Sequence, residues 1–364
     1  MNKIILNIIA AGLDENPTLL RTNVLKLIQK VKKSDPNFTS QIIELLDLNA
    51  IGFSSISEIT DVPFDRESKL ALFNVEYCDD ILRPTLPQKI ENIITDFINE
   101  RNHTKELLRD GVLPSKSLLL TGCPGVGKTH LARYLAGELG LKLLTLDLAS
   151  SVSSLLGKTG QNIKAIFQHA RKEPCILFLD EFDAIAKKRD DQTDLGELKR
   201  IVNVLLKELE DWPYYSIIIA ATNHPEMLDK AIWRRFDIII NLPLPDYIGR
   251  LNIINEHFVD IKIENVDMLI AFIAKITDGA SGADLENVIN RLKRKSILTK
   301  NFSTPEVLVE LSKYVEHKNA KINKEFCIFA RETTNLSLND LSKLLNKHKS
   351  SIQYYLRENT HEKN

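Results

Sequence analysis

The chain has few of the features that mark secreted, metal-stabilised or membrane proteins. Its cysteines are Cys78, Cys123, Cys175 and Cys327. They lie far apart and form no C-x-x-C pair, which disfavours both a disulfide framework and a structural zinc site. No stretch approaches the roughly 18 consecutive apolar residues of a membrane span. These absences predict a protein of the reducing cytoplasm with no membrane partner.

Charge of one sign is not in excess either. The 48 Lys and Arg residues nearly balance the 49 Asp and Glu residues, for a net charge of −1. Bulk charge therefore favours neither nucleic acid nor a membrane surface as a partner, although local patches remain open. The apolar run Ile4–Gly12 is interrupted by Asn7 and followed by Asp14 without a cleavage pattern. We expect a helix there and not a signal peptide.

Hydrophobic periodicity divides the chain into four parts. Residues 1–80 predict a helical N-terminal module and a linker, which we interpret as a packing or docking unit without chemistry of its own. Residues 81–245 alternate strand and helix patterns, which predicts an α/β fold with a mostly parallel sheet covered by helices on both faces. Residues 246–318 predict a helical lid, and residues 319–364 a small helical C-terminal module.

A glycine-rich loop stands between the first strand and the first helix of the α/β part. It reads Gly122-Cys-Pro-Gly-Val-Gly-Lys128-Thr129, the P-loop pattern in the context that pattern requires. Lys128 supplies a charge for the β- and γ-phosphates, and Thr129 a hydroxyl for Mg²⁺. The loop predicts bound ATP and Mg²⁺, with contacts from Gly122, Pro124, Gly125, Val126, Gly127, Lys128, Thr129 and His130.

Two further strands deliver polar side chains at their carboxyl ends. Strand Cys175–Asp180 ends in Asp180, a candidate Mg²⁺ ligand, followed by Glu181, a candidate base for the attacking water. Another strand ends before Asn223, whose amide can orient that water or touch the γ-phosphate. The alternatives are a solvated acidic turn at Asp180 and a turn-capping role for Asn223.

Together these motifs resemble the AAA ATPases. The resemblance covers roughly Leu82 to Val315 and rests on the P-loop, the acidic strand, Asn223, Arg234-Arg235-Phe236-Asp237 and Gly279–Asp284. Within that family, two segments, Arg234–Asp237 and Glu197–Arg200, resemble those of a group of small bacterial AAA proteins. The resemblance implies a P-loop sheet followed by a lid, ATP hydrolysis, and a ring, usually a homo-hexamer, with ATP at each interface.

The resemblance also implies roles for residues outside the loop. Arg235 maps onto the arginine that reaches the neighbouring subunit's ATP, with Arg234 as its companion; a surface arginine pair is the alternative. Gly282 and Ala283 map onto backbone contacts to adenosine. Independently, Ser281 and Asp284 have the spacing of a capping box. Leu155-Leu156-Gly157 stands where many AAA motors carry an aromatic pore loop, so an apolar grip without the aromatic is expected.

The C-terminal module has the spacing of a helix-turn-helix. Leu341, Leu345, Ile352 and Leu356 would form its core, with Ser342 at the helix contact and Asn346 in the turn. The second helix would present Lys349, Ser350, Ser351, Gln353 and Tyr354 to a major groove, with Lys343 and Lys347 near phosphates. The alternative is a helical hairpin that packs on the lid or recruits a protein.

Two functions remain open at this point. The first is a ring-shaped, ATP-hydrolysing motor that remodels an unidentified protein client. The second is a nucleic-acid-associated, ATP-dependent switch that uses the C-terminal module. A scaffold that only holds nucleotide is disfavoured, because Glu181, Asn223 and Arg235 supply the equipment for hydrolysis.

Overall fold

The structure is a computed structural model that describes residues 73–78, 81–148, 159–184, 195–258, 263, 265–299 and 302–361. These residues belong to one unit of the chain, Phe73–Asn364. Nearly all of the predicted N-terminal module and the whole of Leu155–Gly157 lie outside the described residues. The predictions for both segments therefore stay predictions.

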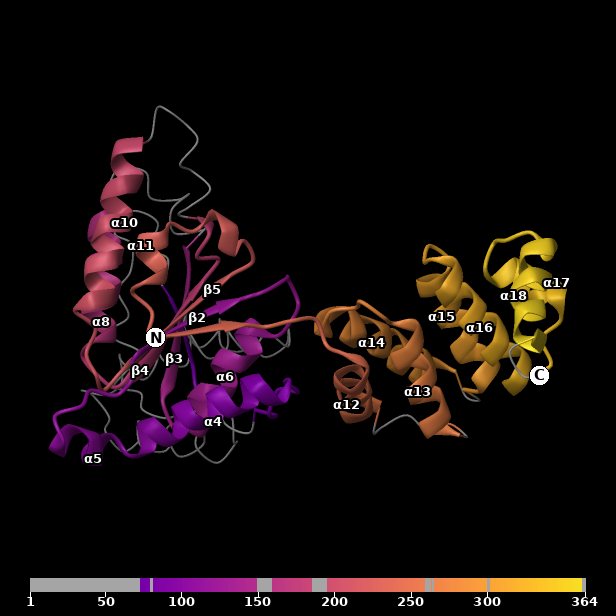
Figure 1. The fold of residues 1–364 in the computed structure, drawn as a ribbon, viewed down its shortest axis with the longest axis horizontal. Helices are drawn as coiled ribbons and strands as arrows, with labels where there is room; N and C mark the ends of the chain where they lie inside the picture. Colours follow the sequence, from indigo (N-terminus) through magenta and orange to yellow (C-terminus); the bar gives the residue numbers. More distant parts are fainter. Residues whose placement is uncertain are drawn as a thin grey trace, which may run out of the picture. The chain divides into compact units, whose positions relative to one another are not determined.

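A six-stranded sheet forms the first part of the described chain (Figure 1). Its strand order is β1-β3-β4-β5-β2-β6. The edge strand β1 is antiparallel to β3, and the other neighbours are parallel, which confirms the predicted mostly parallel sheet. The strands are β1 (Asn74–Glu76), β2 (Ser117–Thr121), β3 (Lys142–Asp147), β4 (Cys175–Asp180), β5 (Ile217–Thr222) and β6 (Ile238–Asn241).

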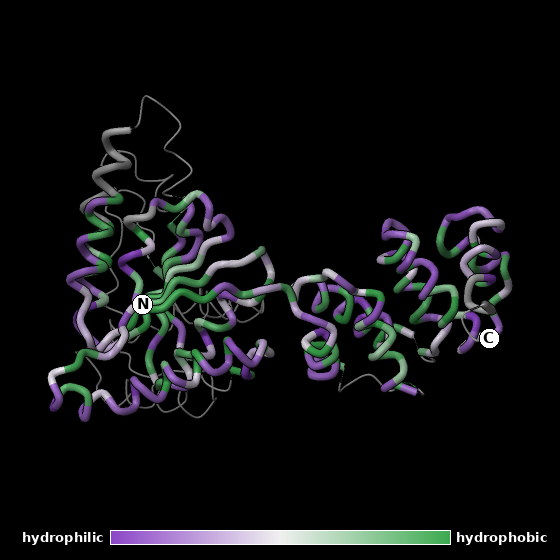
Figure 2. The backbone as a smooth tube through the Cα atoms, in the orientation of Figure 1, coloured by the Kyte–Doolittle hydropathy of each residue, from purple (hydrophilic) through white to green (hydrophobic). Residues whose placement is uncertain are grey.

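Helices cover both faces of this sheet, as its sequence predicts. Along β2, Leu118 and Leu120 belong to one buried cluster with residues of α4 (Gln88–Asn102) and α6 (Lys128–Glu138). Leu119 points to the opposite face, and all three leucines are fully buried. That face is covered by α8 (Thr159–Ala170) and α10 (Leu195–Glu210), as Figure 1 shows. Figure 2 shows the strands as a largely hydrophobic band, as burial on both faces requires.

Seven helices follow the sheet in the part of the chain that the structure describes. One buried cluster joins residues from Ile254 to Ile352, so helices on both sides of residue 318 share a core. The predicted boundary at residue 319 thus falls between helices of one packed group. The helices are α12 (Tyr247–Phe258), α13 (Val266–Ile276), α14 (Gly282–Leu298), α15 (Thr304–Val315), α16 (Ala320–Thr333), α17 (Leu338–Leu344) and α18 (Lys349–His361).

Several short elements of the structure have no counterpart in the sequence-based prediction, among them β1 and α5 (Thr104–Arg109). Strand β1 lies in the stretch expected to be a linker; its three residues are too few for a visible period, and it is held through pairing with β3. The Glu76 carboxylate also accepts from Arg133 of α6, with Nε at 2.8 Å. The short helix α5 has no buried residue, so its sequence carries no hydrophobic pattern.

Candidate nucleotide-binding site

The loop between β2 and α6 has a backbone that only glycine adopts readily. Gly122, Gly125 and Gly127 have φ values of 143°, 78° and 100°. A Cβ at Gly122 would lie 2.3 Å from the Leu242 carbonyl oxygen, and one at Gly125 would lie 2.7 Å from Ser281 Oγ. The helix α6 begins after Gly127 without a side-chain cap, so its first amides remain available to an anion. Conformation and close packing together explain the glycines, and the loop fits a phosphate.

Strand order brings the predicted polar residues to one edge of the sheet. Because β5 lies between β2 and β4, the residue after β5 stands between the loop and Asp180. Lys128 Nζ donates to Asn223 Oδ1 at 2.6 Å and to the carbonyl oxygens of Gly122 and Cys123 at 2.7 and 3.0 Å. Lys128 and Asn223 therefore form one hydrogen-bonded group at the carboxyl edge.

The environment of Lys128 changes its protonation equilibrium. The residue is only 8% exposed, and burial lowers the pKa of its ammonium group. The negative charge of Asp180 acts in the opposite direction on the same pKa. Phosphate oxygens would add further negative charge beside the ammonium, so an anionic ligand fits the position electrostatically.

Glu181 has an unusual backbone directly after β4. Its φ is 51°, in the left-handed region, which costs a non-glycine residue on the order of 1 kcal/mol or more. The conformation is held on both sides: Glu181 N donates to Asp180 Oδ1 at 2.9 Å, and Phe182 N donates to the Ala221 carbonyl at 2.9 Å. Phe182 is itself buried against Phe236. These contacts hold the Glu181 backbone in one conformation and so set the direction of its side chain at the end of β4. The sequence carries no sign of this backbone strain.

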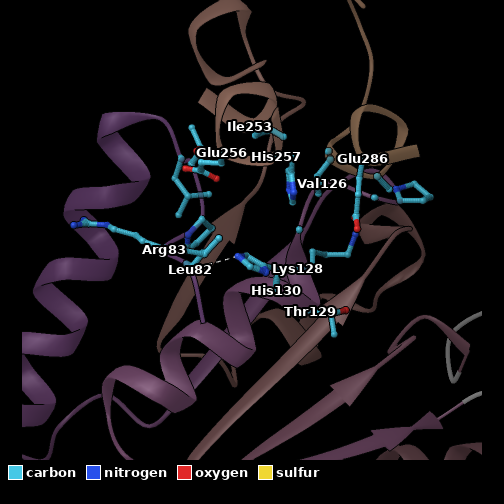
Figure 3. Close-up of a pocket in the computed structure, with 18 of the residues that line it drawn as sticks. Leu82, Arg83, Val126, Lys128, Thr129, His130, Ile253, Glu256, His257 and Glu286 are labelled. Carbon is cyan, nitrogen blue, oxygen red and sulfur yellow. Dashed lines mark hydrogen bonds between the residues drawn. The ribbon is translucent and has the colours of Figure 1, made fainter. Parts of the chain in front are cut away.

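A cavity of about 470 Å³ opens at this edge, a volume suited to a mononucleotide. Its lining includes Lys128, Asp180, Glu181 and Asn223 from the sheet edge, as well as residues of the lid. Figure 3 shows Ile253, Glu256 and His257 of α12 across the cavity from Lys128, Thr129 and His130. The cavity brings together every predicted loop residue from Pro124 to His130.

The lid contacts the loop directly. Ala283 N donates to the Gly125 carbonyl oxygen at 3.1 Å, and Gly282 and Ala283 both line the cavity. The predicted capping box is confirmed, because Ser281 Oγ accepts from Asp284 N at 3.2 Å and Ser281 N donates to Asp284 Oδ2 at 3.0 Å. The Asp284 carboxylate also accepts from Ser281 Oγ at 2.8 Å, and the two hydrogen bonds that it accepts lower the pKa of Asp284, the one from the Ser281 backbone amide most of all.

Two groups of lining residues, and Glu286 of α14 in addition to them, are absent from the sequence-based prediction. One is the segment Leu82–Leu86 before α4, whose Leu82 carbonyl oxygen lies 2.9 Å from His130 Nε2 (dashed in Figure 3). The other is Ile253, Glu256 and His257, three and four residues apart and thus on one face of α12. That spacing was the available signal for the second group; the first joins the site through a non-local contact and carries none.

The structure places Arg234 and Arg235 away from this cavity. Both are exposed after α11 (Lys230–Trp233), at the amino edge of the sheet. The Arg235 carbonyl oxygen accepts from Ser117 Oγ at 3.3 Å. Ser117 is the first residue of β2, and the glycine-rich loop follows the last residue of that strand. At about 3.3 Å per residue, β2 separates Arg235 from its own loop by roughly 16 Å. The Arg235 guanidinium pairs instead with the Glu210 carboxylate of α10.

Within the part of the chain that the structure describes, no group of three or more His, Cys, Asp or Glu side chains is placed to hold a metal ion. A magnesium ion bound through phosphates needs few protein ligands, and the Thr129 hydroxyl and Asp180 carboxylate are oxygen donors of the type it prefers. Among the same described residues, none of the helices has both the length and the hydrophobicity that crossing a membrane requires.

Comparison with known proteins gives a consistent result. Residues 118–244 match the family described as ATPase family associated with various cellular activities (AAA). A Sinorhizobium fredii protein named uncharacterized AAA family ATPase y4kL is 36% identical over 218 residues, which are 59% of this chain and 64% of that protein.

Two other relatives carry more descriptive names. The Saccharomyces cerevisiae mitochondrial inner membrane i-AAA protease supercomplex subunit YME1 is 39% identical over 251 residues, 66% of this chain and 33% of its own. The Pyrococcus abyssi proteasome-activating nucleotidase is 42% identical over 185 residues, 49% of this chain and 46% of its own. The chain thus spans less than two thirds of the length of each of these relatives.

Proposed function

We propose, from the match of residues 118–244 to the AAA family of ATPases, that the chain hydrolyses Mg·ATP and uses the energy to remodel a protein client. The proposed assembly is a homo-hexameric ring. The observation that carries the proposal is the convergence of Lys128, Asn223, Asp180 and Glu181 on one cavity at the carboxyl edge of the sheet.

Each of these side chains has a definite task in the proposed reaction. Bound Mg·ATP would supply the phosphoryl group and the cation that offsets its charge. Lys128 exchanges its bonds to loop carbonyls for bonds to phosphate oxygens, while Thr129 and Asp180 hold the cation.

The remaining two side chains act on the water that attacks the phosphoryl group. Glu181 accepts the proton of that water, and Asn223 orients the water or the γ-phosphate oxygen that it approaches. The strained Glu181 backbone supports this assignment, because such strain concentrates at functional positions.

The position of Arg235 supports a ring. The backbone of Arg235 lies about 16 Å from its own loop, farther than its side chain extends, yet an exposed arginine can reach the ATP of an adjacent copy. In such a ring Arg235, with Arg234 beside it, completes the neighbour's site. The Arg235–Glu210 pair would have to open for that contact to form.

The choice of a protein client draws on the relatives. One is named as a protease supercomplex subunit and one as a nucleotidase that activates the proteasome, so both names connect them with protein turnover. The alternative, a nucleic-acid-associated ATP-dependent switch, draws its support from α17 and α18 alone.

A nucleotide-dependent trap tests the client. The Glu181→Gln variant should hold ATP and client together, so cross-linking in cells should recover proteins that the Lys128→Ala control does not. Purified candidates should then raise the ATPase rate of the unmodified chain. If the trap recovers nothing beyond the control and no recovered protein raises the rate, the remodelling function is wrong.

A further inference from the structure

Helices α17 and α18 follow one another with a short turn between them, in the order expected for a helix-turn-helix (Figure 1). Residues 345–348 separate them, a turn of the usual length for this motif. Asn346, expected in the turn, has φ of 47°, a left-handed conformation that asparagine tolerates. Ser342 and Lys347 lock the turn, because Ser342 Oγ donates to the Lys347 carbonyl at 2.6 Å and Lys347 N donates to the Ser342 carbonyl at 3.0 Å.

The apolar side chains of α17 and α18 are packed into the core of the helical region. Leu341, Leu345 and Ile352 are completely buried, and Leu356 packs against the same cluster. Helix α16 packs against α18 and completes a three-helix unit that is continuous with the lid core. The hairpin therefore does pack on the lid, as the alternative interpretation expected. That packing occupies only one face of α18.

The outer face of α18 is polar and exposed. Lys349, Ser350, Gln353, Tyr354 and Arg357 are exposed, at the one-turn spacing that puts side chains on one side of a helix. Tyr354 is 60% exposed, a large aromatic surface for a residue with buried neighbours on the same helix. Such a face offers hydrogen-bond donors, acceptors and an aromatic edge, and its side chains remain solvent-exposed among the residues that the structure describes.

The charge of this region is one-sided, unlike that of the chain as a whole. From Leu341 to Arg357 the sequence has four cationic residues, Lys343, Lys347, Lys349 and Arg357, and its flanking carboxylates are Asp340 before it and Glu358 after it. The nearest preceding carboxylate, Asp340, accepts the amide and hydroxyl hydrogen bonds of Ser337 in a capping box. The region therefore complements a polyanion.

We infer that α17 and α18 bind duplex DNA, with the exposed face of α18 in the major groove. Lys343 and Lys347 lie in and beside the turn, where they contact phosphates, and Lys349 adds charge at the start of α18. Gln353 and Tyr354 face the base edges. Duplex RNA is a poor ligand for the same face, because its major groove is too narrow for a helix. The inference does not depend on ATP hydrolysis or on the protein client.

The test measures binding of the full-length chain to a fluorescent duplex. A mixed-sequence DNA of about 30 base pairs and the matching RNA duplex are titrated by anisotropy at several salt concentrations. The decisive variant combines Lys343→Gln, Lys347→Gln and Lys349→Gln. Its matched control combines Lys89→Gln, Lys105→Gln and Lys295→Gln, which removes the same charge from exposed positions on α4, α5 and α14.

The expected result is DNA binding that weakens steeply with salt and exceeds RNA binding. Loss of three phosphate contacts should lower the salt slope by about 3 and the affinity near 0.1 M salt by about 10² to 10³-fold, while the control binds like the unmodified chain. Lys128→Ala should leave DNA binding intact, so failure of the ATPase proposal would be recognisable separately.

Several outcomes would overturn the inference. The first is no detectable DNA binding at about 50 mM salt. The second is an equal loss of DNA affinity in the decisive variant and in its control. The third is equal affinity for the RNA and DNA duplexes. Analytical sedimentation of both triple variants tests whether the exposed face of α18 binds a second copy of this chain instead of DNA. If only the α17–α18 substitutions change self-association and DNA binding is unaffected, the face joins copies of this chain and the inference is wrong.

Discussion

The two edges of the sheet differ in what their polar side chains contact. At the carboxyl edge, Lys128, Asp180 and Asn223 line a cavity, and the bonds of Lys128 to loop carbonyls can be exchanged for bonds to a ligand. At the amino edge, Asp237 Oδ2 accepts from Lys116 N, Ser117 N and Ser117 Oγ within 3.0 Å. One edge is arranged for chemistry, and the other for attachment of the strands.

Arg235 is the exception that makes the comparison informative. It is anchored at the amino edge through its backbone, yet it carries an exposed cationic group. An isolated chain has no use for that group at its own cavity. In a ring, the amino edge of one subunit would supply charge to the carboxyl edge of the next.

The largest effect is expected for Arg235→Ala. Loss of a guanidinium that acts on the neighbouring ATP should lower the ATPase rate by about 10³ to 10⁵-fold, with little change in ATP affinity. Steady-state ATPase assays and nucleotide titration measure the two quantities. Mixing this variant with Glu181→Gln subunits should restore some activity at hybrid interfaces. Verified mixed rings without any recovery would contradict action in trans.

Glu181→Gln should have the next largest effect. The amide keeps the size of the side chain and loses its ability to accept a proton, so turnover should fall by about 10² to 10⁴-fold while ATP binding persists. Single-turnover hydrolysis and equilibrium binding separate the two. Turnover equal to that of the unmodified chain would remove Glu181 as the base.

Lys128→Ala should act on binding. Removing a charge-assisted contact worth about 1.5 to 3 kcal/mol should weaken ATP affinity by about 10 to 100-fold. Calorimetry against ATP measures the change, and Lys105→Ala, at an exposed position on α5, is the control. Undiminished affinity would place the phosphates elsewhere.

Asp237→Ala should affect the other edge in a different way. Three hydrogen bonds to the start of β2 are lost, so we expect about 1 kcal/mol less stability toward urea. The folded variant should retain its ATP affinity, because the carboxyl edge is unchanged. A loss of affinity without a loss of stability would erase the distinction between the two edges.

The smallest effect is expected for Ser281→Ala, which removes the cap of α14. The cost should be about 1 kcal/mol at neutral pH. The lowered pKa of Asp284 means that the contribution of its carboxylate is fully present above the ordinary value of 3.8 and is lost as the pH falls through the lowered folded value. The difference in urea midpoint between this variant and the unmodified chain should therefore shrink in acid.

Local signals predicted the fold well. Strand β4 has the bounds that its pattern indicated, and α12 to α15 lie in the stretch predicted to form a helical lid, because burial on both faces or along one helical stripe leaves a clear trace in sequence. Asn346 lies in the predicted turn, and its left-handed backbone is one that asparagine tolerates.

Non-local features of the site could not be predicted in this way. The approach of Leu82 to His130 joins residues far apart in the chain, and neither residue type signals it. The strain at Glu181 arises from bonds made by its neighbours to Asp180 and Ala221, not from a property of glutamate. The Arg235–Glu210 pair likewise depends on how α10 packs on the sheet.

The hydrogen bond from Ala283 N to the Gly125 carbonyl oxygen links the phosphate loop directly to α14. A neutral bond of this kind contributes only about 0.5 to 1.5 kcal/mol, far less than the free energy of binding a nucleotide tightly. A ligand that reorients the Gly125 peptide can therefore break or form this hydrogen bond at a small cost in free energy. Since α14 and α18 share one core, the same motion would reach the far end of the helical region.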